Sequence, residues 1–344
     1  MTRQPVLVIA LESDLHADSV VHQLLKLGAP VTRIDPTSDR SLPNTVTIRF
    51  RDRCQAEYDF GTDGRLSSDE VTGVLCRFAL EKLVPAEGSP LEQFSRAEEI
   101  AAFLAFLRLI DSHKWINDPW REARADCRIL QAQKAREAGL TAPPFLVSSH
   151  YSSLVRFAES QPGGCVIKPI SDAALARING EFVEPSRLRT GQFQAPYAAD
   201  FTGLSGEEAE RVDPTPSLVQ ARIRKKLDIR ATVVDDQVFA AAMPCGPDDP
   251  VDFRRSARAS AVPFSLPEGI EGALVELVSS LGLRFASCDL VEDESGDLHF
   301  LESNVSGNWL WTELDANLAI SRALAIALQN STTSLSKPPS LCAG

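Results

Sequence analysis

A mostly apolar stretch near the end of the chain carries two oxygen-bearing side chains two residues apart. The sequence HFLESNVSGNWLW, residues 299–311, places Glu302 and Asn304 on a predicted strand. Because side chains alternate between the two faces of a strand, both point to one face. Asp289 lies on the preceding predicted strand, across a hairpin turn at 294–297. Three oxygen ligands on one hairpin face suit Mg²⁺, which also takes phosphate oxygens.

Three further charged residues suit phosphate chemistry. Lys168 ends the apolar strand GGCVIKPI, where a lysine can reach into a cleft as a point charge for phosphate. Asp228 and Arg230 share one face of the strand KKLDIRATVV, so Arg230 could hold a phosphate or carboxylate while Asp228 orients it. Other readings stay open: an exposed strand-end lysine, a cross-strand ion pair, and solvated acidic residues on an open sheet face.

Composition and missing motifs exclude several classes of protein. The sequence contains neither G-x-x-x-x-G-K-[ST] nor G-x-G-x-x-G, so neither a P-loop nor a dinucleotide site is supported. A net charge of -12 argues against nucleic acid as a partner. No apolar run approaches the roughly 20 residues that span a bilayer. The cysteines form no C-x-x-C pair and the histidines are scattered, which predicts free thiols in a reducing cytoplasm and no zinc site.

The predicted elements indicate an α/β fold of several domains. An apolar strand at 5–10, a helix at 18–27 ended by Gly28, and the strand PVTRID form a β-α-β opening, typical of a doubly wound parallel sheet. Further helices are predicted at 92–110, 120–138, 266–281 and 314–328. A polar stretch at 171–215 includes a predicted mobile loop. The predicted units are an N-terminal domain at 1–115, a central unit at 116–205, a C-terminal unit at 206–330 and a disordered tail at 331–344.

The order of these segments resembles a known superfamily. The sequences WINDPW, AREAGLTAPP, CVIKP, LVQARI, DIRATVV, VFAAAM and LESNVSGNWLW follow one another as in ATP-grasp enzymes. Within that superfamily the chain is most similar to the graspetide, or microviridin-type, synthetases that macrocyclise ribosomal peptides. The most specific piece is LESNVSGNWLW, which is similar to the Glu-x-Asn-x-x-Gly-x-Trp pattern of that group. DIRATVV also occurs in ribosomal-protein glutamate ligases and indicates the superfamily only.

This resemblance implies a fold, cofactors and roles for individual residues. The fold would be ATP-grasp, with an N-terminal doubly wound domain, a small central α+β domain and a C-terminal α+β domain; the cofactors would be ATP and Mg²⁺. The implied nucleotide-binding residues are Arg128, Lys168, Asp228 and an adenine hinge formed by Gln220, Ala221, Arg222 and Ile223. The implied catalytic residues are Arg230, which supports the phosphates or the acyl phosphate, and Arg254, which faces the acceptor. The implied metal ligands are Asp289, Glu302 and Asn304.

Two arginines differ from the pattern of the family. Arg128 stands where relatives usually carry a lysine, and arginine can hold phosphate bidentately but with a different reach. Arg77, in the segment CRF, is a single arginine where relatives often have two. From the sequence alone, the simpler interpretation of Arg77 is a surface residue.

The implied activity is that of an ADP-forming ligase. It would activate Asp or Glu side chains of a ribosomal precursor peptide as acyl phosphates, and Ser, Thr or Lys side chains would then form ester or amide cross-links. The peptide would carry a leader besides its core. The rival interpretations are an ATP-grasp ligase that adds an amino acid to a protein or small molecule, and a nucleotide-binding pseudoenzyme that only recognises a peptide. A homodimer is one further partner arrangement left open.

Overall fold

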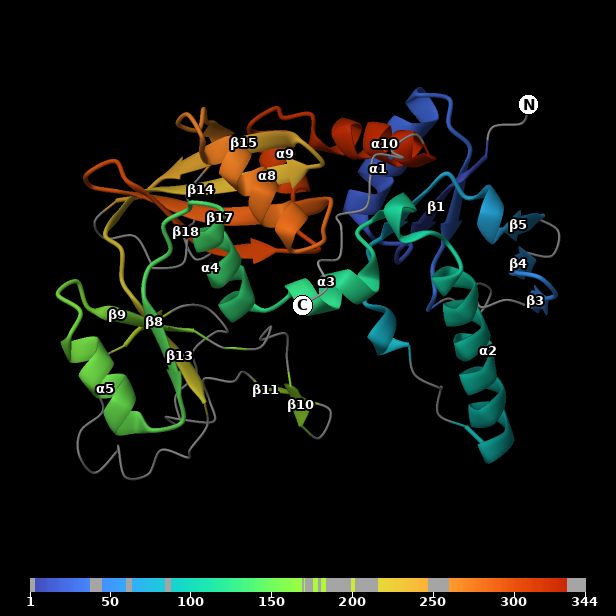
Figure 1. Cartoon of the computed structure of the whole chain (residues 1–344), viewed down its shortest axis with the longest axis horizontal. Helices are drawn as coiled ribbons and strands as arrows, with labels where there is room; N and C mark the ends of the chain where they lie inside the picture. The colour runs from blue at the N-terminus through green and yellow to red at the C-terminus, as the bar shows by residue number, and fades with distance from the viewer. Residues whose placement is uncertain are drawn as a thin grey trace.

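The computed structural model describes residues 4–37, 45–59, 64–83, 88–168, 170, 176–178, 181–183, 199–201, 216–246 and 260–332. The N-terminal domain lies at one end of the molecule, and two further sheets lie at the other end (Figure 1). In the part of the chain described, no helix combines the length and the apolar character needed to cross a membrane.

The N-terminal domain is built on a parallel sheet, as the β-α-β opening predicts. Its strand order is β2-β1-β6-β7, and all pairs are parallel. The strands are β1 (Val6–Ile9), β2 (Val31–Ile34), β6 (Gly73–Cys76) and β7 (Trp115–Ile116). Helix α1 (Leu15–Lys26) follows β1, and the Asp14 side chain caps it by accepting from the Ala17 N–H.

A small antiparallel sheet and a long helix complete this domain. The sheet has the order β3-β4-β5 and contains β3 (Thr45–Phe50), β4 (Cys54–Asp59) and β5 (Arg65–Ser67). Helix α2 (Pro90–Arg108) begins with a capping box between Ser89 and Glu92. Short 3-10 turns are η2 (Ser68–Glu70), η3 (Leu80–Lys82), η4 (Ser112–Lys114) and η6 (Asn330–Thr332).

The last helix of the chain packs against the first. The single helix predicted at 314–328 is wrong: α9 (Leu310–Asp315) and α10 (Ile320–Gln329) are separate, with Asn317 at a positive φ of 50° between them. Leu324 and Leu328 of α10 share a buried core with Val20 and Leu24 of α1. The two ends of the described chain therefore stabilise one domain.

The central unit is a small antiparallel sheet covered by one helix. The strand order is β12-β9-β13-β8, and helix α5 (Tyr151–Glu159) packs on it. The strands are β8 (Phe145–Ser148), β9 (Cys165–Lys168), β12 (Ala199–Asp200) and β13 (Ser217–Ala221). A separate hairpin consists of β10 (Ala176–Ile178) and β11 (Glu181–Val183). The predicted mobile loop lies mostly outside the described residues.

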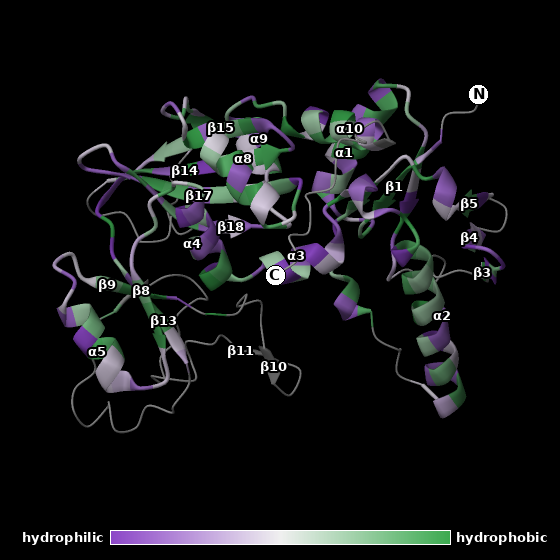
Figure 2. Ribbon diagram, viewed as in Figure 1, coloured by the Kyte–Doolittle hydropathy of each residue, from purple (hydrophilic) through white to green (hydrophobic). Residues whose placement is uncertain are grey.

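The largest sheet is antiparallel, with the order β16-β15-β14-β17-β18. Its strands are β14 (Lys225–Val234), β15 (Gln237–Pro244), β16 (Val262–Pro263), β17 (Phe285–Asp293) and β18 (Leu298–Asn304). Hydrophobic residues are concentrated along β14, β15 and β17 (Figure 2). One face is a buried core that includes Ile229, Ala231 and Cys288, and it packs against α8 (Ile270–Ser280). The opposite face carries the charged residues described below.

One helix predicted from the sequence is interrupted just before Arg128. The predicted helix 120–138 is in fact α3 (Pro119–Ala125) and α4 (Arg128–Glu137), separated by Asp126 and Cys127. The Asp126 backbone has left the helical region, with φ -75° and ψ 59°. The break makes Arg128 the first residue of a new helix, beside strand β18. The predicted domain boundaries stay predictions, and the predicted tail lies almost wholly outside the described residues.

Candidate active site

The large sheet carries one row of charged side chains across three neighbouring strands. Arg230 on β14 stands opposite Asp289 on β17, and Asp289 stands opposite Glu302 on β18. Directly opposed residues of an antiparallel sheet point to the same face. The adjacent row on that face holds Asn304, whose amide nitrogen donates to Asp289 Oδ2 at 3.0 Å. The structure therefore brings together the three predicted magnesium ligands and Arg230, one of the two predicted catalytic arginines.

A β-bulge sets the position of Glu302 within this row. Asp289 pairs with Glu302, but the next residue, Leu290, pairs with Phe300, so Leu301 is an extra residue on β18. A bulge of this kind redirects side chains and is frequent beside active sites. Here it leaves Phe300 in the apolar core and Glu302 on the charged face.

Each of the two carboxylates is paired with an arginine. Arg230 Nη1 lies 2.5 Å from Asp289 Oδ1, and Arg128 Nε lies 2.8 Å from Glu302 Oε2. Burial raises the pKa of Asp289; the Arg230 guanidinium opposes this effect, and the Glu302 carboxylate adds to it. Asp289, which has little access to water, thus depends on the neighbouring guanidinium to remain ionised.

Arg128 joins three parts of the fold. It begins α4, contacts Glu302 on the large sheet, and donates from Nη1 to the Ile170 carbonyl at 3.4 Å. Ile170 lies two residues beyond Lys168, so this contact brings the end of β9 toward the charged row. Lys168 itself is half-buried and pairs in register with Leu218 of β13. Its predicted contact with phosphate stays a prediction.

The side chain of Gln131 fixes α4 to the sheet, which the sequence analysis did not predict. Its amide nitrogen donates to the Ser303 carbonyl and its amide oxygen accepts from the Ser303 N–H, both at 2.9 Å. The same nitrogen donates to the Ala125 carbonyl. Gln131 thus satisfies backbone groups between the two residues predicted to bind metal. A polar residue in a short helix gives no sequence signal for this role.

The structure gives Asp228 other partners than the predicted Arg230, while its implied nucleotide-binding role stays a prediction. Asp228 is buried and lies 2.5 Å from Lys225 Nζ, and the Cys245 thiol donates to it at 3.0 Å. Asp289, not Asp228, orients Arg230. The cross-strand ion pair that the sequence left open is therefore the arrangement found for Arg230.

The predicted adenine hinge lies where the central sheet joins the large sheet. Gln220 and Ala221 end β13, and Arg222 and Ile223 follow in the connection to β14. The Ala221 N–H donates to the Pro144 carbonyl and the Arg222 N–H to the Gly164 carbonyl. The predicted role of this hinge in binding adenine stays a prediction. The predicted acceptor residue Arg254 lies outside the described residues.

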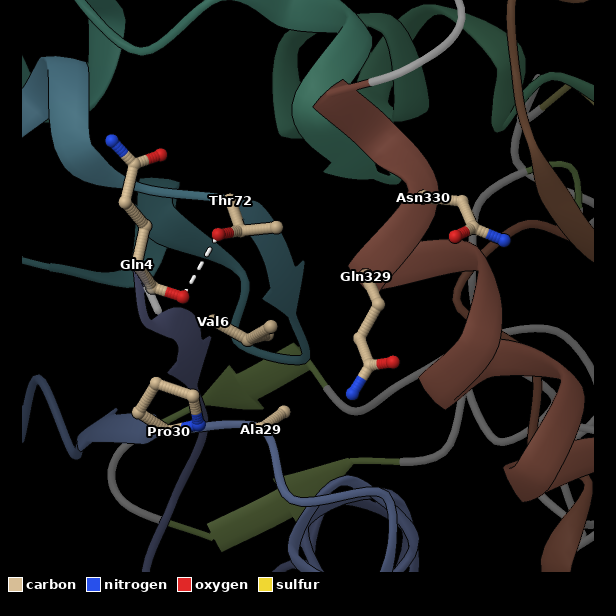
Figure 3. A pocket seen from close by; sticks show the side chains of 7 residues that line it. All are labelled: Gln4, Val6, Ala29, Pro30, Thr72, Gln329 and Asn330. Carbon is tan, nitrogen blue, oxygen red and sulfur yellow. Dashed lines mark hydrogen bonds between the residues drawn. The ribbon is translucent and has the colours of Figure 1, made fainter. Parts of the chain in front are cut away.

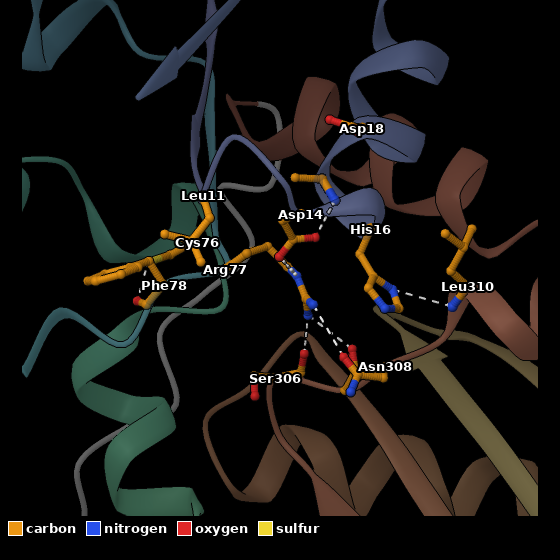
Figure 4. A network of polar contacts seen from close by, with 12 residues as sticks. Leu11, Asp14, His16, Asp18, Cys76, Arg77, Phe78, Ser306, Asn308 and Leu310 are labelled. Carbon is orange, nitrogen blue, oxygen red and sulfur yellow. Dashed lines mark hydrogen bonds and ion pairs between the residues drawn. The ribbon is translucent and has the colours of Figure 1, made fainter. Parts of the chain in front are cut away.

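Arg77 lies inside a polar network and is not a surface residue (Figure 4). Its side chain is only 9% exposed, and its Nε lies 3.2 Å from Asp14 Oδ2. It donates to the carbonyls of Ser306 and Gly307, in the turn that follows β18. The guanidinium also stacks over Trp309, 4.9 Å from the ring centroid. The N-terminal domain thus contacts the segment directly after Asn304.

Asn117 is a second buried connection that the sequence analysis did not predict. Its amide nitrogen donates to the carbonyls of Phe285 and Val305, and its amide oxygen accepts from the N–H groups of Arg284 and Phe285. It therefore ties the end of β7 to the start of β17 and to the residue after β18. Its only sequence signal is a polar residue directly after the apolar pair of β7.

The residues of the charged row fit a magnesium ion. Within the described ranges there is no group of three or more His, Cys, Asp or Glu residues arranged for a metal. The row and the adjacent Asn304 instead offer two carboxylates and one carboxamide. Oxygen ligands of this kind, completed by phosphate oxygens and water, are what Mg²⁺ takes in nucleotide sites. A divalent cation would also neutralise the two neighbouring negative charges of Asp289 and Glu302.

A cavity of about 320 Å³ lies elsewhere, at the amino ends of the strands of the parallel sheet (Figure 3). It is lined by Gln4, Val6, Ala29, Pro30, Thr72, Gln329 and Asn330. Ligands of open α/β sheets bind at the carboxyl ends of the strands, which is the opposite edge. None of the predicted site residues lines this cavity.

Known proteins resemble this chain in structure, although no family model or curated protein matches its sequence. Among solved structures, a Chryseobacterium gregarium RiPP-associated ATP-grasp ligase in complex with ADP and a leader and core peptide superposes with a TM-score of 0.77, at 20% identity over 94% of this chain and 96% of that one. This chain has the ATP-grasp fold. The predicted α/β fold class is thereby confirmed.

Two further ATP-grasp enzymes of known structure also superpose on this chain. Macrocyclase MdnB from Microcystis aeruginosa MRC matches with a TM-score of 0.72 at 25% identity, over 94% of this chain and 99% of that chain. ATP-grasp ligase PsnB, complexed with a minimal precursor, Mg and ADP, matches with a TM-score of 0.67 at 20% identity, over 95% and 98% of the two chains. The likeness to ATP-grasp ligases thus extends over nearly the whole length of this chain.

Proposed function

We propose that this protein is an ATP-dependent, ADP-forming carboxylate ligase that forms intramolecular ester or amide cross-links in a ribosomal precursor peptide. The observation that carries the proposal is the row in which Arg230, Asp289 and Glu302 face one side of the large sheet, with Asn304 beside them. The likeness to macrocyclase MdnB, and to ligases solved with ADP and leader or precursor peptides, supports a peptide as the substrate.

The chemistry follows from the weakness of a carboxylate as an electrophile. Transfer of the terminal phosphoryl group of ATP to an Asp or Glu side chain of the peptide creates an acyl phosphate. A Ser or Thr hydroxyl or a Lys amine then attacks the acyl carbon, and inorganic phosphate leaves with the former carboxylate oxygen. The balance is ATP to ADP and phosphate, with net loss of water from the peptide. Mg²⁺ held by Asp289, Glu302 and Asn304 would neutralise charge on the phosphates.

The two arginines of the site would exchange partners when nucleotide binds. Without a metal, Arg230 and Arg128 neutralise Asp289 and Glu302 at 2.5 and 2.8 Å. A cation bound to these carboxylates would release the guanidinium groups for phosphate oxygens, which they can hold bidentately. No buried charge is left unpaired in either state, and an unpaired buried charge is costly.

The remaining site residues complete the proposal. Lys168 would contact the phosphates, and the hinge at 220–223 would hold the adenine. Arg254 would face the acceptor, and a leader segment would bind between the N-terminal and central domains. Both ATP and a newly made peptide are available in the cytoplasm, where we place the reaction. A homodimer stays a prediction that light scattering of the purified protein can test.

Mass spectrometry tests the proposed reaction. The protein is incubated with ATP, Mg²⁺ and peptides rich in Thr, Ser, Lys, Asp and Glu, beginning with any short peptide encoded beside its gene. Each ring should lower the peptide mass by about 18 Da, with ADP and phosphate as the other products. A mass gain that matches an added amino acid would instead identify an amino-acid ligase. Binding of ATP with no change in any peptide would identify a pseudoenzyme.

A further inference from the structure

Two arginines from different parts of the fold contact the turn after β18. Arg230, from the large sheet, lies with Nη2 3.5 Å from the Asn308 carbonyl. Arg77, from the N-terminal domain, donates to the Ser306 carbonyl, to the Gly307 carbonyl at 3.0 Å, and from Nη2 to Asn308 Oδ1 at 3.4 Å. Figure 4 shows how Arg77 contacts this turn, which thus connects the first domain with the proposed catalytic arginine.

We propose that Arg77 is a positioning residue for the metal site. By holding the turn 306–308, Arg77 fixes Asn304 at one end of the turn and Arg230 at the other. The inference rests on the proposed function, because it takes Asn304 as a metal ligand. It adds that the N-terminal domain, which supplies no predicted ligand, is required for the ligand geometry.

The environment of Arg77 suits a fixed support and not a phosphate contact. Nε is engaged by Asp14, Nη1 by two turn carbonyls and Nη2 by Asn308. The guanidinium lies over Trp309, and the His16 ring packs edge-on against the same indole, with 4.6 Å between the ring centroids. Each guanidinium nitrogen already has a protein partner, and the side chain is nearly buried. A guanidinium held in this way keeps one orientation.

Movement of the turn would be transmitted directly to Asn304. The Gly307 N–H donates to the Asn304 carbonyl at 3.1 Å. A Cβ atom at Gly307 would lie only 2.5 Å from Ser287 Oγ, so the turn backbone lies against β17. The Asn304 side chain in turn donates to Asp289 at 3.0 Å. A shift of about 1 Å in a supporting residue is enough to impair a preorganised site.

The topology of the first domain supports the same interpretation. In its strand order, β2-β1-β6-β7, the chain runs outward from β1 to β2 on one side and continues with β6 on the other. The carboxyl ends of β1 and β6 therefore flank the crevice where open α/β sheets bind their ligands. Asp14 and Arg77 follow these two strands, and what Arg77 holds there is the turn 306–308 of the same chain.

The test compares two arginines that both join the domains. Arg284 binds Asp235 bidentately at 2.7 and 2.8 Å and donates to the His113 and Ala327 carbonyls, but it contacts no residue of the turn 306–308 among the described contacts. Arg284→Ala is therefore the matched control for Arg77→Ala. Arg77→Lys keeps the charge and serves as a second variant. Mn²⁺ binding in the presence of ADP, followed by electron paramagnetic resonance, reads the metal site without turnover.

We expect Mn²⁺ affinity to fall about 10- to 100-fold in Arg77→Ala, the range typical of lost outer-sphere support, and less in Arg77→Lys. Arg284→Ala should lower the melting temperature yet keep the affinity of the parent protein. Unchanged affinity in folded Arg77→Ala would overturn the inference, and so would an equal loss in Arg284→Ala. If the parent protein itself fails to bind Mn²⁺ with ADP, the proposed function falls and takes this inference with it.

Discussion

The two antiparallel sheets that carry the proposed site differ in how firmly they are built. The large sheet has an extensive core with α4 and α8, in which Ile229, Ala231, Leu277 and Phe300 are essentially inaccessible. In the described part of the central sheet, the apolar cluster under α5 has only three buried residues, Leu154, Cys165 and Val219. Regions with few buried apolar contacts open at lower free energy than a large core. The central sheet is therefore the part of the site expected to move more easily.

This difference assigns separate tasks to the two sheets. Groups that must share one geometry, Arg230, Asp289 and Glu302, occupy one row of the firm sheet. Lys168, which is expected to follow the phosphates, ends a strand of the smaller sheet. Closure of a mobile unit over a rigid ligand set is a common way to exclude water from a transferring group. In the described structure, Arg128 already links the two units, through Glu302 and the Ile170 carbonyl.

The largest loss of turnover is expected from substitutions in the large sheet. Glu302→Ala or Asn304→Ala should lower ATP turnover with peptide by about 10³-fold or more, because a metal ligand is lost from the reacting phosphate. Steady-state ADP release measures this effect, and circular dichroism checks the fold. The matched control is Glu292→Gln, a carboxylate of the same hairpin that pairs with Lys226 at 2.9 Å, away from the row. Near-normal turnover in a folded Glu302→Ala protein would remove the magnesium assignment.

The next largest loss of turnover is expected from substitution of Arg128, which links the large sheet to the central sheet. Arg128→Ala should lower turnover by about 10²-fold, since the partly buried Glu302 carboxylate loses its cation and the phosphates lose a predicted donor. Arg128→Lys should keep substantial activity because the charge remains. Isothermal titration with ADP and Mg²⁺ separates binding from turnover. Parent-like ATP affinity and turnover in Arg128→Ala would show that this arginine only packs its helix against the sheet.

A smaller effect is expected in the central sheet. Lys168→Ala should raise the KM for ATP about tenfold and leave the melting temperature nearly unchanged, because one charge-assisted contact is lost at a half-buried strand end. Lys226→Ala, which removes a lysine that is 62% exposed from the large sheet, is the control. A loss as large as that of Glu302→Ala would contradict the proposed division between a rigid and a mobile unit.

The smallest expected effect is a change of the melting temperature with pH, caused by Glu122 near the interface of the N-terminal domain. Burial raises the pKa of Glu122 to about 7; Arg77 opposes this, and Asp126 and Glu81 add to it. A carboxyl whose pKa is raised in the folded state favours folding while protonated, so its contribution is lost as pH rises through about 7. The melting temperature should therefore fall between pH 6 and pH 8.5, and Glu122→Gln should reduce that fall. An identical slope in the variant would show that Glu122 does not titrate in this range.

His16 should affect the melting temperature at acidic pH, below the range in which Glu122 is tested. Burial, and to a smaller extent Arg77, lower the pKa of His16 to about 4, against the opposing effect of Asp14. Its neutral form favours folding, so its contribution is lost as pH falls from the usual histidine range toward 4. Measurements at or above pH 6.5 therefore report mainly on Glu122.

The sequence predicted the residues of the row better than it predicted their partners. Period-two alternation is enough to place Glu302 and Asn304 on one face, and the hairpin around 294–297 is present as expected. The pairings of Arg230 and Asp228 could not be read in this way, because alternation gives the face of a strand but not its neighbour. Asp289 lies 59 residues from Arg230 along the chain, and only the strand order makes them adjacent.

The supporting residues were harder still to predict. Gln131 and Asn117 each reach backbone groups more than a hundred residues away, through an amide that fits several positions. The break between α3 and α4 is not marked by Gly or Pro, so local propensity favours one continuous helix. The new helix instead follows the edge of β18, where Arg128 and Gln131 have their partners. Tertiary contacts decided these features.

The most direct test of the account follows an oxygen atom. A substrate peptide with ¹⁸O-labelled Asp and Glu carboxylates is incubated with the protein, ATP and Mg²⁺, and the released phosphate is analysed by mass spectrometry. If the charged row supports an acyl phosphate, each cross-link should transfer one ¹⁸O to phosphate and raise its mass by about 2 Da, with ADP as the nucleotide product. Unlabelled phosphate, or AMP in place of ADP, from a peptide that has lost water would contradict the account.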